Sequence, residues 1–155
     1  MDKQTFQKEV IARREMLYRI AKTICFSDAD CEDAVQNAIL KAFTNIKKLR
    51  SEQYFSTWLV RIVINECCAL NKKNRKNITF EEYLSSEETT ERDFTELYEA
   101  IAKLPEKVRI AVELHYIEDC SVEETAEILN IPEGTVKSRL SAGRDKIKNY
   151  LEELI

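Results

Sequence analysis

Turn-forming residues are scarce in this chain, which has only two Gly and two Pro among its 155 residues. A many-stranded sheet needs a turn between each pair of strands, and Gly and Pro supply the backbone conformations that many of those turns require. The long stretches between them are filled with Glu, Lys, Leu, Ile and Ala, as is typical of helical segments. Because 44% of the residues are hydrophobic, the chain can bury a core. We therefore predict an all-α protein of one ordinary domain or two small ones.

Charge is distributed in blocks along the chain. Residues 1–78 carry 15 Lys and Arg against 9 Asp and Glu, whereas residues 79–99 carry 1 against 8. The middle of the acidic block lacks a strong apolar period, which favours a flexible linker over a packed helix. We predict two small helical domains, residues 1–78 and 98–155, joined by an acidic linker over 79–97.

Apolar residues at helical spacing predict the helices of the first module. These helices are expected over Lys3–Cys25, Ala29–Asn45 and Phe55–Lys73, with a short turn region between the last two. Ser27 can cap the second helix. In that helix Val35, Ile39 and Ala42/Phe43 should face the core. The outward side then carries polar residues that are either solvated surface or a binding face: Asp33, Gln36, Asn37 and Lys41.

The helix expected over 55–73 ends in a concentration of positive charge. Arg61 and Asn65, four residues apart, share one side of it, and the basic segment "NKKNRK" follows. The loop "RSEQYF" before the helix contains aromatic rings. Bases of single-stranded nucleic acid can stack on rings while cations hold the phosphates. A basic helix end that complements the helix dipole explains the same cations, and this stretch alone leaves both interpretations open.

A helix-breaking turn lies within the helical pattern near the C-terminus. Ser121 and Glu124 form a capping-box pattern that begins a short helix, and Pro132 with Glu133 begins another. Two helices joined by the tight turn "LNI" are typical of a helix-turn-helix.

The second of these helices has an apolar side and a polar side. Val136, Leu140, Gly143 and Ile147 fall at steps of four, three and four, which predicts a core stripe in which Gly143 permits close approach. Outward residues of such a helix can bind phosphates and read base edges in a major groove. A solvated surface is the competing interpretation, but the capped helix, the turn and the basic helix together favour DNA binding. The expected outward residues are Thr135, Lys137, Ser138, Arg139, Ser141 and Arg144.

Other classes of function find little support in the sequence. Five cysteines form an odd set without a C-x-x-C pair, which favours buried, reduced thiols over a disulfide framework. The chain has a single histidine, His115, so the case for a metal site is weaker still. The simplest role for His115 is that of a helix residue at a core edge. The sequence shows no glycine-rich phosphate loop and no nucleophile with a base, so we expect neither an enzyme nor a cofactor. Without a long apolar run or a signal-peptide pattern, we expect a cytoplasmic protein that does not insert into membranes.

Two stretches resemble a family of bacterial transcription proteins. "LPEKVRIAVELHYIEDCSVEETAEILNIPEGTVKSRLSAGRDKI" closely resembles region four of RNA polymerase sigma factors, and "DADCEDAVQNAILKAF" with "FSTWLVRIVIN" resembles their region two. With an acidic linker and no segment that resembles region three, the whole is similar to an extracytoplasmic-function (ECF) sigma factor of the sigma-70 family. The resemblance implies a promoter-specificity subunit whose partners are core RNA polymerase, promoter DNA and an anti-sigma factor.

The resemblance also implies three sets of site residues. The clamp helices of the polymerase beta-prime subunit would be met by Asp33, Gln36, Asn37 and Leu40, and the beta flap would be a further contact of the chain. The minus-10 promoter element, with a flipped base of the non-template strand, would be met by Arg50, Ser51, Glu52, Gln53, Tyr54, Trp58, Arg61, Asn65, Lys72 and Lys73. The minus-35 element would be met by Thr135, Lys137, Ser138, Arg139, Ser141 and Arg144.

The chain departs from the family pattern at a few positions. Ala69 stands where the family often has Asp, and Ala142 and Asp145 stand where it is often basic. The loss of phosphate contacts implies weaker binding to free DNA and more dependence on the polymerase. Two alternatives stay open: a stand-alone helix-turn-helix regulator, which gives "EDAVQ" and "FSTWL" only packing roles, and a helical adaptor without DNA affinity.

Overall fold

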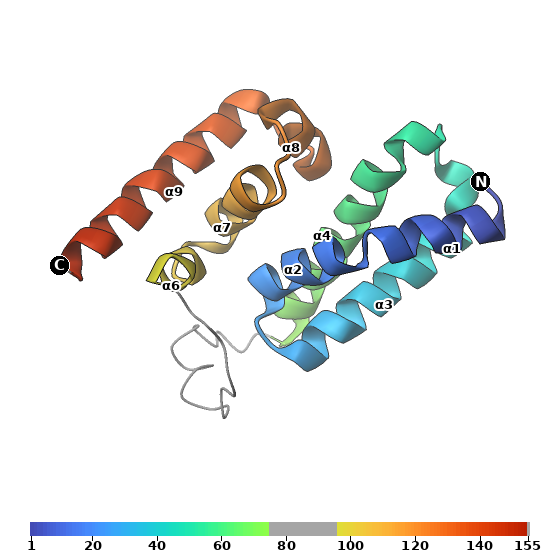
Figure 1. The fold of residues 1–155 in the computed structure, drawn as a ribbon, viewed down its shortest axis with the longest axis horizontal. Coiled ribbons are helices and arrows are strands. Elements are labelled where there is room, and N and C mark those ends of the chain that lie inside the picture. The colour runs from blue at the N-terminus through green and yellow to red at the C-terminus, as the bar shows by residue number, and fades with distance from the viewer. Residues whose placement is uncertain (75–95, 155) are drawn as a thin grey trace. The chain divides into compact units, whose positions relative to one another are not determined.

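Helices make up the regular structure of the chain in the computed structural model, which describes residues 1–74 and 96–154. No strand occurs in those two ranges, and the all-α prediction is confirmed. The described residues form two compact units, one that holds the residues before 75 and one that holds most of the residues after 95 (Figure 1). Most of the predicted acidic linker lies outside the described residues, so its flexibility stays a prediction.

The N-terminal unit comprises α1 (Lys3–Ala12), α2 (Arg14–Cys25), α3 (Asp28–Thr44), the short 3-10 turns η1 (Ile46–Lys48) and η2 (Glu52–Tyr54), and α4 (Phe55–Asn74). The C-terminal unit comprises α6 (Glu96–Ala102), α7 (Glu106–Val112), the π-helix η3 (Glu113–Ile117), α8 (Val122–Leu129) and α9 (Glu133–Glu153). The bounds of α3, α4 and α8 lie within a few residues of the predicted ones.

The core of the N-terminal unit is shared by α2, α3 and α4. On α2, Leu17, Ile20 and Ile24 recur at steps of three and four and are at most 1% exposed. Full burial of one such side chain contributes about 1.5–3 kcal/mol to folding. Small residues on α3 leave room for its neighbours to approach. The buried residues that α3 and α4 add are Cys31, Ala34, Val35, Ala38, Ala42, Phe55, Leu59, Val60, Val63, Ile64 and Cys67.

The prediction of one continuous helix over Lys3–Cys25 is wrong, because the helix is interrupted at Arg13. This residue has φ −105° and ψ 2° and separates α1 from α2. Its guanidinium donates to the carbonyl oxygen of Glu9 at 3.0 Å and pairs with the carboxylate of Glu9 at 2.6 Å. The guanidinium carbon of Arg13, Cζ, lies 5.5 Å from the centroid of the Phe55 ring. These contacts stabilise a bend that neither Gly nor Pro marks in the sequence.

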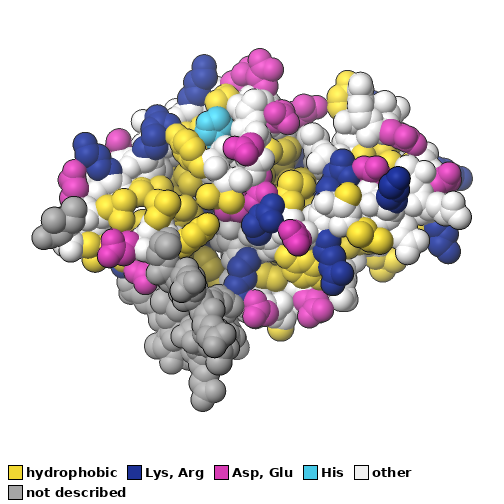
Figure 2. Space-filling model, in the orientation of Figure 1, with side chains coloured by type: hydrophobic (Ala, Val, Ile, Leu, Met, Phe, Trp, Pro, Cys, Tyr) yellow, Lys and Arg dark blue, Asp and Glu magenta, His cyan; other side chains and the backbone are white. Residues whose placement is uncertain are grey.

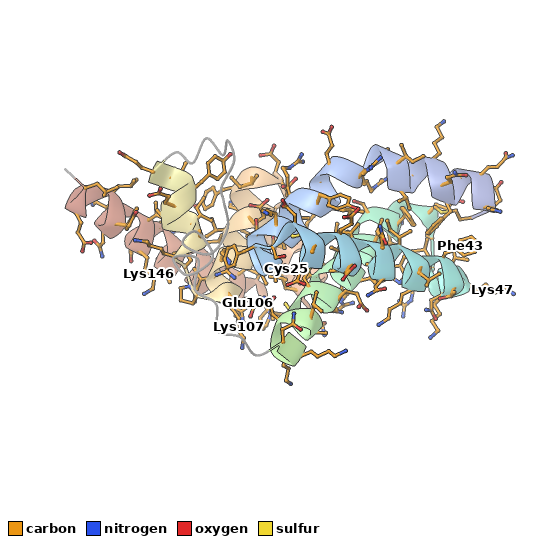
Figure 3. The ribbon with its side chains drawn as sticks, turned by 90° about the horizontal axis from the view of Figure 1, so that it is seen from below. Cys25, Phe43, Lys47, Glu106, Lys107 and Lys146 are labelled. Atoms are coloured by element: carbon orange, nitrogen blue, oxygen red, sulfur yellow. The ribbon has the colours of Figure 1, made fainter. Side chains whose placement is uncertain are left out.

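The predicted core face of α3 is only partly buried. Val35 and Ala42 are buried, whereas Ile39 is half-buried and Phe43 is 42% exposed. Phe43 lies near the C-terminal end of α3 (Figure 3), where its ring meets the Phe6 ring of α1 edge-on at a centroid distance of 5.3 Å. Phe43 therefore covers the edge of the core instead of filling it.

The C-terminal unit is built around the close approach of α7 and α9. Val112, Val136 and Leu140 are at most 3% exposed, and Ile147 is half-buried. A Cβ atom added to Gly143 would lie 2.7 Å from Cγ2 of Val112 and 3.3 Å from Cγ1 of Val108. The predicted close approach at Gly143 is confirmed, since any larger residue there must displace the Val112 side chain.

Replacing Gly143 with alanine should lower the free energy of unfolding by about 1 kcal/mol. Alanine gains about 1 kcal/mol over glycine inside a helix, but overpacking a core costs roughly 1–3 kcal/mol. The stiff, buried Val112 side chain makes the second effect the larger. Urea denaturation followed by circular dichroism measures the change. The matched control is Gly134→Ala, because no atom lies within 4 Å of a Cβ there; a Gly143→Ala chain as stable as that control would contradict the prediction.

Three of the five cysteines are buried together between α2, α3 and α4. Cys25 donates its thiol to the carbonyl oxygen of Cys67 at 3.9 Å. Hydrogen bonding with Cys25, together with burial, raises the pKa of Cys31 well above its ordinary value. Burial raises the pKa of the half-buried Cys120 to about 11. The raised pKa values keep the Cys31 and Cys120 thiols protonated at neutral pH, which favours the inert role predicted for them.

The helices within residues 1–74 and 96–154 are too short or too polar for any of them to cross a bilayer.

Candidate nucleic-acid and docking interfaces

The four residues predicted to dock on a partner lie together on one exposed face of α3. Asp33, Gln36, Asn37 and Leu40 occupy successive turns and are all exposed, with Leu40 at 63%. The face is held in place by the buried side of the same helix. The Ser27 hydroxyl accepts from the backbone N–H of Asp30 at 3.4 Å, so the predicted cap begins α3.

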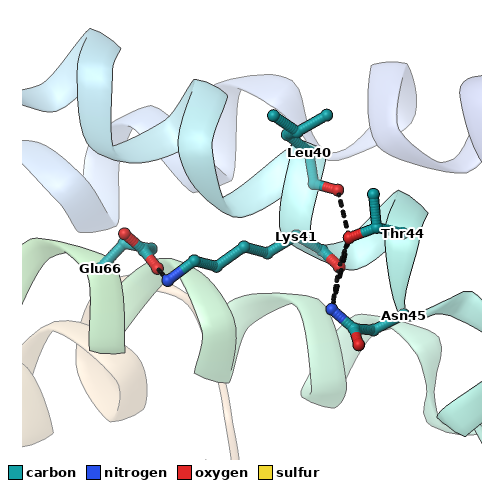
Figure 4. A network of polar contacts seen from close by, with 5 residues as sticks. All are labelled: Leu40, Lys41, Thr44, Asn45 and Glu66. Carbon is teal, nitrogen blue, oxygen red and sulfur yellow. Dashed lines mark hydrogen bonds and ion pairs between the residues drawn. The ribbon is translucent and has the colours of Figure 1, made fainter.

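The C-terminal end of α3 is fixed by a polar network (Figure 4). The Thr44 hydroxyl lies 3.1 Å from the carbonyl oxygens of both Leu40 and Lys41, and the Asn45 amide donates to the carbonyl oxygen of Lys41 at 2.8 Å. These side chains add hydrogen bonds in the last turn of α3, where the carbonyl oxygen of Lys41 also accepts from the backbone N–H of Asn45 at 3.0 Å. The ammonium of Lys41 pairs with the carboxylate of Glu66 on α4. This ion pair joins the helix that carries the docking face to the helix that carries the predicted minus-10 residues.

The predicted minus-10 residues come from one loop and one helix. The loop residues are all exposed, and Tyr54, the last residue of η2, is 44% exposed. On α4, Trp58 and Arg61 are half-buried, whereas Asn65, Lys72 and Lys73 are exposed. The Trp58 ring tilts against the buried Phe55 ring at a centroid distance of 6.2 Å. The exposed loop residues are Arg50, Ser51, Glu52, Gln53 and Tyr54.

Hydrogen bonds fix both ends of α8, the first helix of the predicted helix-turn-helix. At its start, the capping box is confirmed, since Glu124 N–H donates to the Ser121 hydroxyl at 3.0 Å and Ser121 N–H donates to the Glu124 carboxylate at 3.1 Å. At the end of α8, Asn130 takes the left-handed conformation with φ 55°. Ile131 N–H then donates to the carbonyl oxygen of Ala126 at 3.0 Å, as in a Schellman motif.

Most of the predicted DNA-binding residues of α9 face outward. Lys137, Ser138, Ser141 and Arg144 are exposed, whereas Thr135 and Arg139 are half-buried. The Ser138 hydroxyl donates to the carbonyl oxygen of Gly134 at 3.0 Å, which leaves its lone pairs to accept from a ligand. Figure 2 shows basic and acidic side chains interspersed on the visible surface.

Two family models cover most of the chain. "Sigma-70 region 2" matches residues 10–77 and "Sigma-70, region 4" matches residues 94–147. The ECF RNA polymerase sigma-E factor of Haemophilus influenzae is 30% identical over 81% of this chain and 77% of its own length. This chain is an ECF sigma factor of the sigma-70 family.

Other relatives agree with that assignment. The ECF sigma factor SigW of Bacillus subtilis is 28% identical over 99% of this sigma factor and 92% of its own length. The fold is similar to that of RpoE from Bartonella quintana, solved in complex with the anti-sigma factor NepR, with a TM-score of 0.79 at 22% identity. That match covers 96% of this sigma factor and 98% of RpoE.

Family membership decides between the alternatives that the sequence leaves open. The chain is a subunit for transcription initiation and not an isolated helix-turn-helix regulator or an adaptor, because the matches include region 2 as well as region 4. The family is one of non-enzymatic subunits. "EDAVQ" and "FSTWL" both fall within the region 2 match.

Two contacts of this sigma factor could not be found from sequence patterns. One is the ion pair of Lys41 with Glu66, which joins two helices whose relative register no periodicity specifies. The other is the hydrogen bond from Arg144 Nη1 to the Tyr116 hydroxyl, 2.8 Å long, in which Tyr116 belongs to the π-helix η3. Hydrophobic spacing predicts α-helical turns, and it gave no sign that the helix widens at this point.

Proposed function

We propose that this sigma factor docks on the beta-prime clamp helices and the beta flap of core RNA polymerase and directs initiation at promoters with minus-35 and minus-10 elements. Each of three surfaces has one role in the proposal. The docking face on α3 binds polymerase, the surface of η2 and α4 binds the minus-10 element, and the outward side of α9 binds the minus-35 element. The observation that carries the proposal is that an exposed docking face and a well-formed helix-turn-helix occur in the same chain.

The docking role is supported by the composition of the α3 face. A carboxylate, two amides and a leucine are exposed within about two helical turns, on a helix fixed at its start by Ser27 and at its end by Thr44 and Asn45. Rigid presentation lowers the entropic cost of binding. The acidic and amide groups suit basic and polar groups on the polymerase, and Leu40 suits an apolar contact.

The minus-10 role is supported by rings and cations on the same short stretch. Tyr54 and Trp58 both reach the surface, and Arg61, Lys72 and Lys73 supply positive charge along α4. A flipped base needs a ring or pocket to replace its lost stacking, and the strand needs cations near its phosphates. We assign the capture of the non-template strand to this surface.

The minus-35 role is supported by the outward side of α9. Lys137 and Arg139 lie in the half of the helix that follows the turn, which is the half that contacts base edges in helix-turn-helix proteins. Ala142 is half-buried and Asp145 is exposed, so this helix offers fewer phosphate contacts than the family pattern. We infer weak binding to free DNA, with recognition that depends on assembly with the polymerase.

Regulation by an anti-sigma factor is part of the proposal. The fold is similar to those of RpoE, solved with the anti-sigma factor NepR, and of CnrH, solved with the cytosolic domain of CnrY. A partner of this kind would cover exposed apolar residues such as Leu40, together with the DNA-binding surfaces, until it is removed.

Run-off transcription tests the proposed function directly. Purified bacterial core polymerase is given a pool of upstream fragments from the genome of origin, with and without this sigma factor. We expect new start sites that share two spaced sequence elements. Silence on every fragment, combined with specific DNA binding by the chain alone, would overturn the proposal in favour of a stand-alone regulator. Silence combined with no DNA binding would overturn it in favour of an adaptor.

A further inference from the structure

Arg144, one of the proposed minus-35 residues, makes a contact that the proposed function does not explain. Its Nη1 donates to the hydroxyl of Tyr116 at 2.8 Å, across 28 positions in the sequence. Both residues are exposed, with Tyr116 at 45%. The contact joins the outward side of α9 to the π-helix η3 that follows α7.

The backbone brings these two residues together at a defined place. Gly143 allows α9 to approach Val112 at the end of α7, and Arg144 is the next residue along α9. Tyr116 lies four residues after Val112, inside the π-helix, where Glu118 N–H donates to the carbonyl oxygen of Glu113. A π-turn adds a residue to the helical repeat and is frequent at functional sites. Here the wider turn places the Tyr116 ring beside Arg144.

The Tyr116 ring is itself supported from behind. It packs edge-on against the His115 ring, with centroids 4.8 Å apart and an interplanar angle of 73°. His115 is held in turn by its Nδ1, which lies 2.8 Å from the carbonyl oxygen of Cys120. The hydroxyl that receives Arg144 therefore belongs to a side chain whose ring has a packing partner.

We propose that Tyr116 is a positioning residue for minus-35 recognition, which it serves by holding the guanidinium of Arg144 ready for promoter DNA. The proposal rests on the proposed function of Arg144. A tyrosine hydroxyl is a neutral acceptor, so it orders the side chain without cancelling the positive charge that a phosphate needs. A guanidinium has five N–H donors, and this contact occupies one of them. The remaining donors stay available to the DNA.

The expected gain comes from ordering Arg144 before it binds. A free arginine loses rotamer freedom when it contacts DNA, and the cost of immobilising one such side chain corresponds to about a two- to tenfold change in affinity. An arginine that is already held loses less. A purely structural role for the contact predicts instead a loss of stability that Tyr116→Phe and Arg144→Ala share.

A double-mutant cycle on holoenzyme tests the proposal. Transcription is measured on a promoter found in the run-off pool, with Tyr116→Phe, Arg144→Ala and both changes together. We expect Tyr116→Phe to lower transcription about two- to tenfold when Arg144 is present and to have no further effect in the Arg144→Ala chain. The phenylalanine keeps the ring, so the melting temperature should stay unchanged. The matched control is Tyr98→Phe, an exposed tyrosine on α6, which should leave transcription unchanged.

Each other outcome overturns a separate part of the proposal. Equal losses from Tyr116→Phe with and without Arg144 would show that the tyrosine acts on stability or on another group. No loss from Tyr116→Phe, while Arg144→Ala is impaired, would remove the positioning role and leave the function of Arg144 intact. No loss from Arg144→Ala would remove Arg144 from the proposed minus-35 set, and the positioning role with it, although the sigma activity itself would stand.

Discussion

Replacing Asp33 and Gln36 together with alanine is expected to weaken the affinity of the chain for core RNA polymerase by about ten- to a hundredfold. Both side chains are exposed on the docking face of α3, and truncation of a residue central to an interface commonly costs more than about 1 kcal/mol. The melting temperature should hardly change, because neither side chain contributes to the buried core. Competition for core polymerase against a labelled sigma factor measures the affinity.

The docking experiment has a matched control within the same unit. Gln7 on α1 and Glu15 on α2 are also an exposed amide and an exposed carboxylate. The double change Gln7→Ala and Glu15→Ala removes the same chemistry from other helices and should leave competition unchanged. If Asp33→Ala with Gln36→Ala lowered the melting temperature by many degrees, the two residues would be structural and the docking assignment would be wrong.

The second large effect is expected from Arg139→Ala, which should reduce transcription by about ten- to a hundredfold at promoters that depend on the minus-35 element. A good side-chain contact to a base pair contributes about 1–3 kcal/mol of discrimination. Arg139 is half-buried on the half of α9 that follows the turn. Binding to core polymerase should remain normal, because the proposed clamp-helix contacts lie on α3.

A promoter with a scrambled minus-35 element shows whether the loss comes from DNA recognition. On that template the Arg139→Ala chain and the unchanged chain should become equally weak. Lys148→Ala controls for loss of one positive charge, since Lys148 is an exposed cation in the distal half of the same helix. A loss of polymerase binding by Arg139→Ala would contradict the division of labour between the two units.

Local sequence signals predicted those parts of the fold that have local causes. The cap at Ser27, the capping box of Ser121 with Glu124, and the close approach at Gly143 each follow from a residue type at a fixed position, and each is present. The break at Arg13 and the exposure of Phe43 were missed. Both depend on aromatic residues from distant segments, such as Phe55 and Phe6, and no window of neighbouring residues contains those contacts.

For the candidate site too, helical spacing predicted which residues are exposed but not the contacts between distant segments. Helical spacing predicted that Asp33, Gln36 and Asn37 lie on the outward side of α3, and they are exposed. Their polymerase contact came from family resemblance and stays a prediction, as do the promoter contacts of α4 and α9. The link from Arg144 to Tyr116 was not predictable, because it depends on how far a π-turn displaces one ring. Such a displacement is set by the packing of whole helices and not by residue spacing.

Trp58 is a natural fluorescent probe that reports on the N-terminal unit alone. It is the single tryptophan of a sequence that also has six tyrosines, and it stands half-buried beside Phe55 on the proposed minus-10 surface. Excitation at a wavelength that only tryptophan absorbs will therefore produce fluorescence from the N-terminal unit and none from the C-terminal unit. In the isolated chain, a change in that emission when single-stranded DNA is added would report binding at the proposed minus-10 surface, separately from events at α9, without any attached dye.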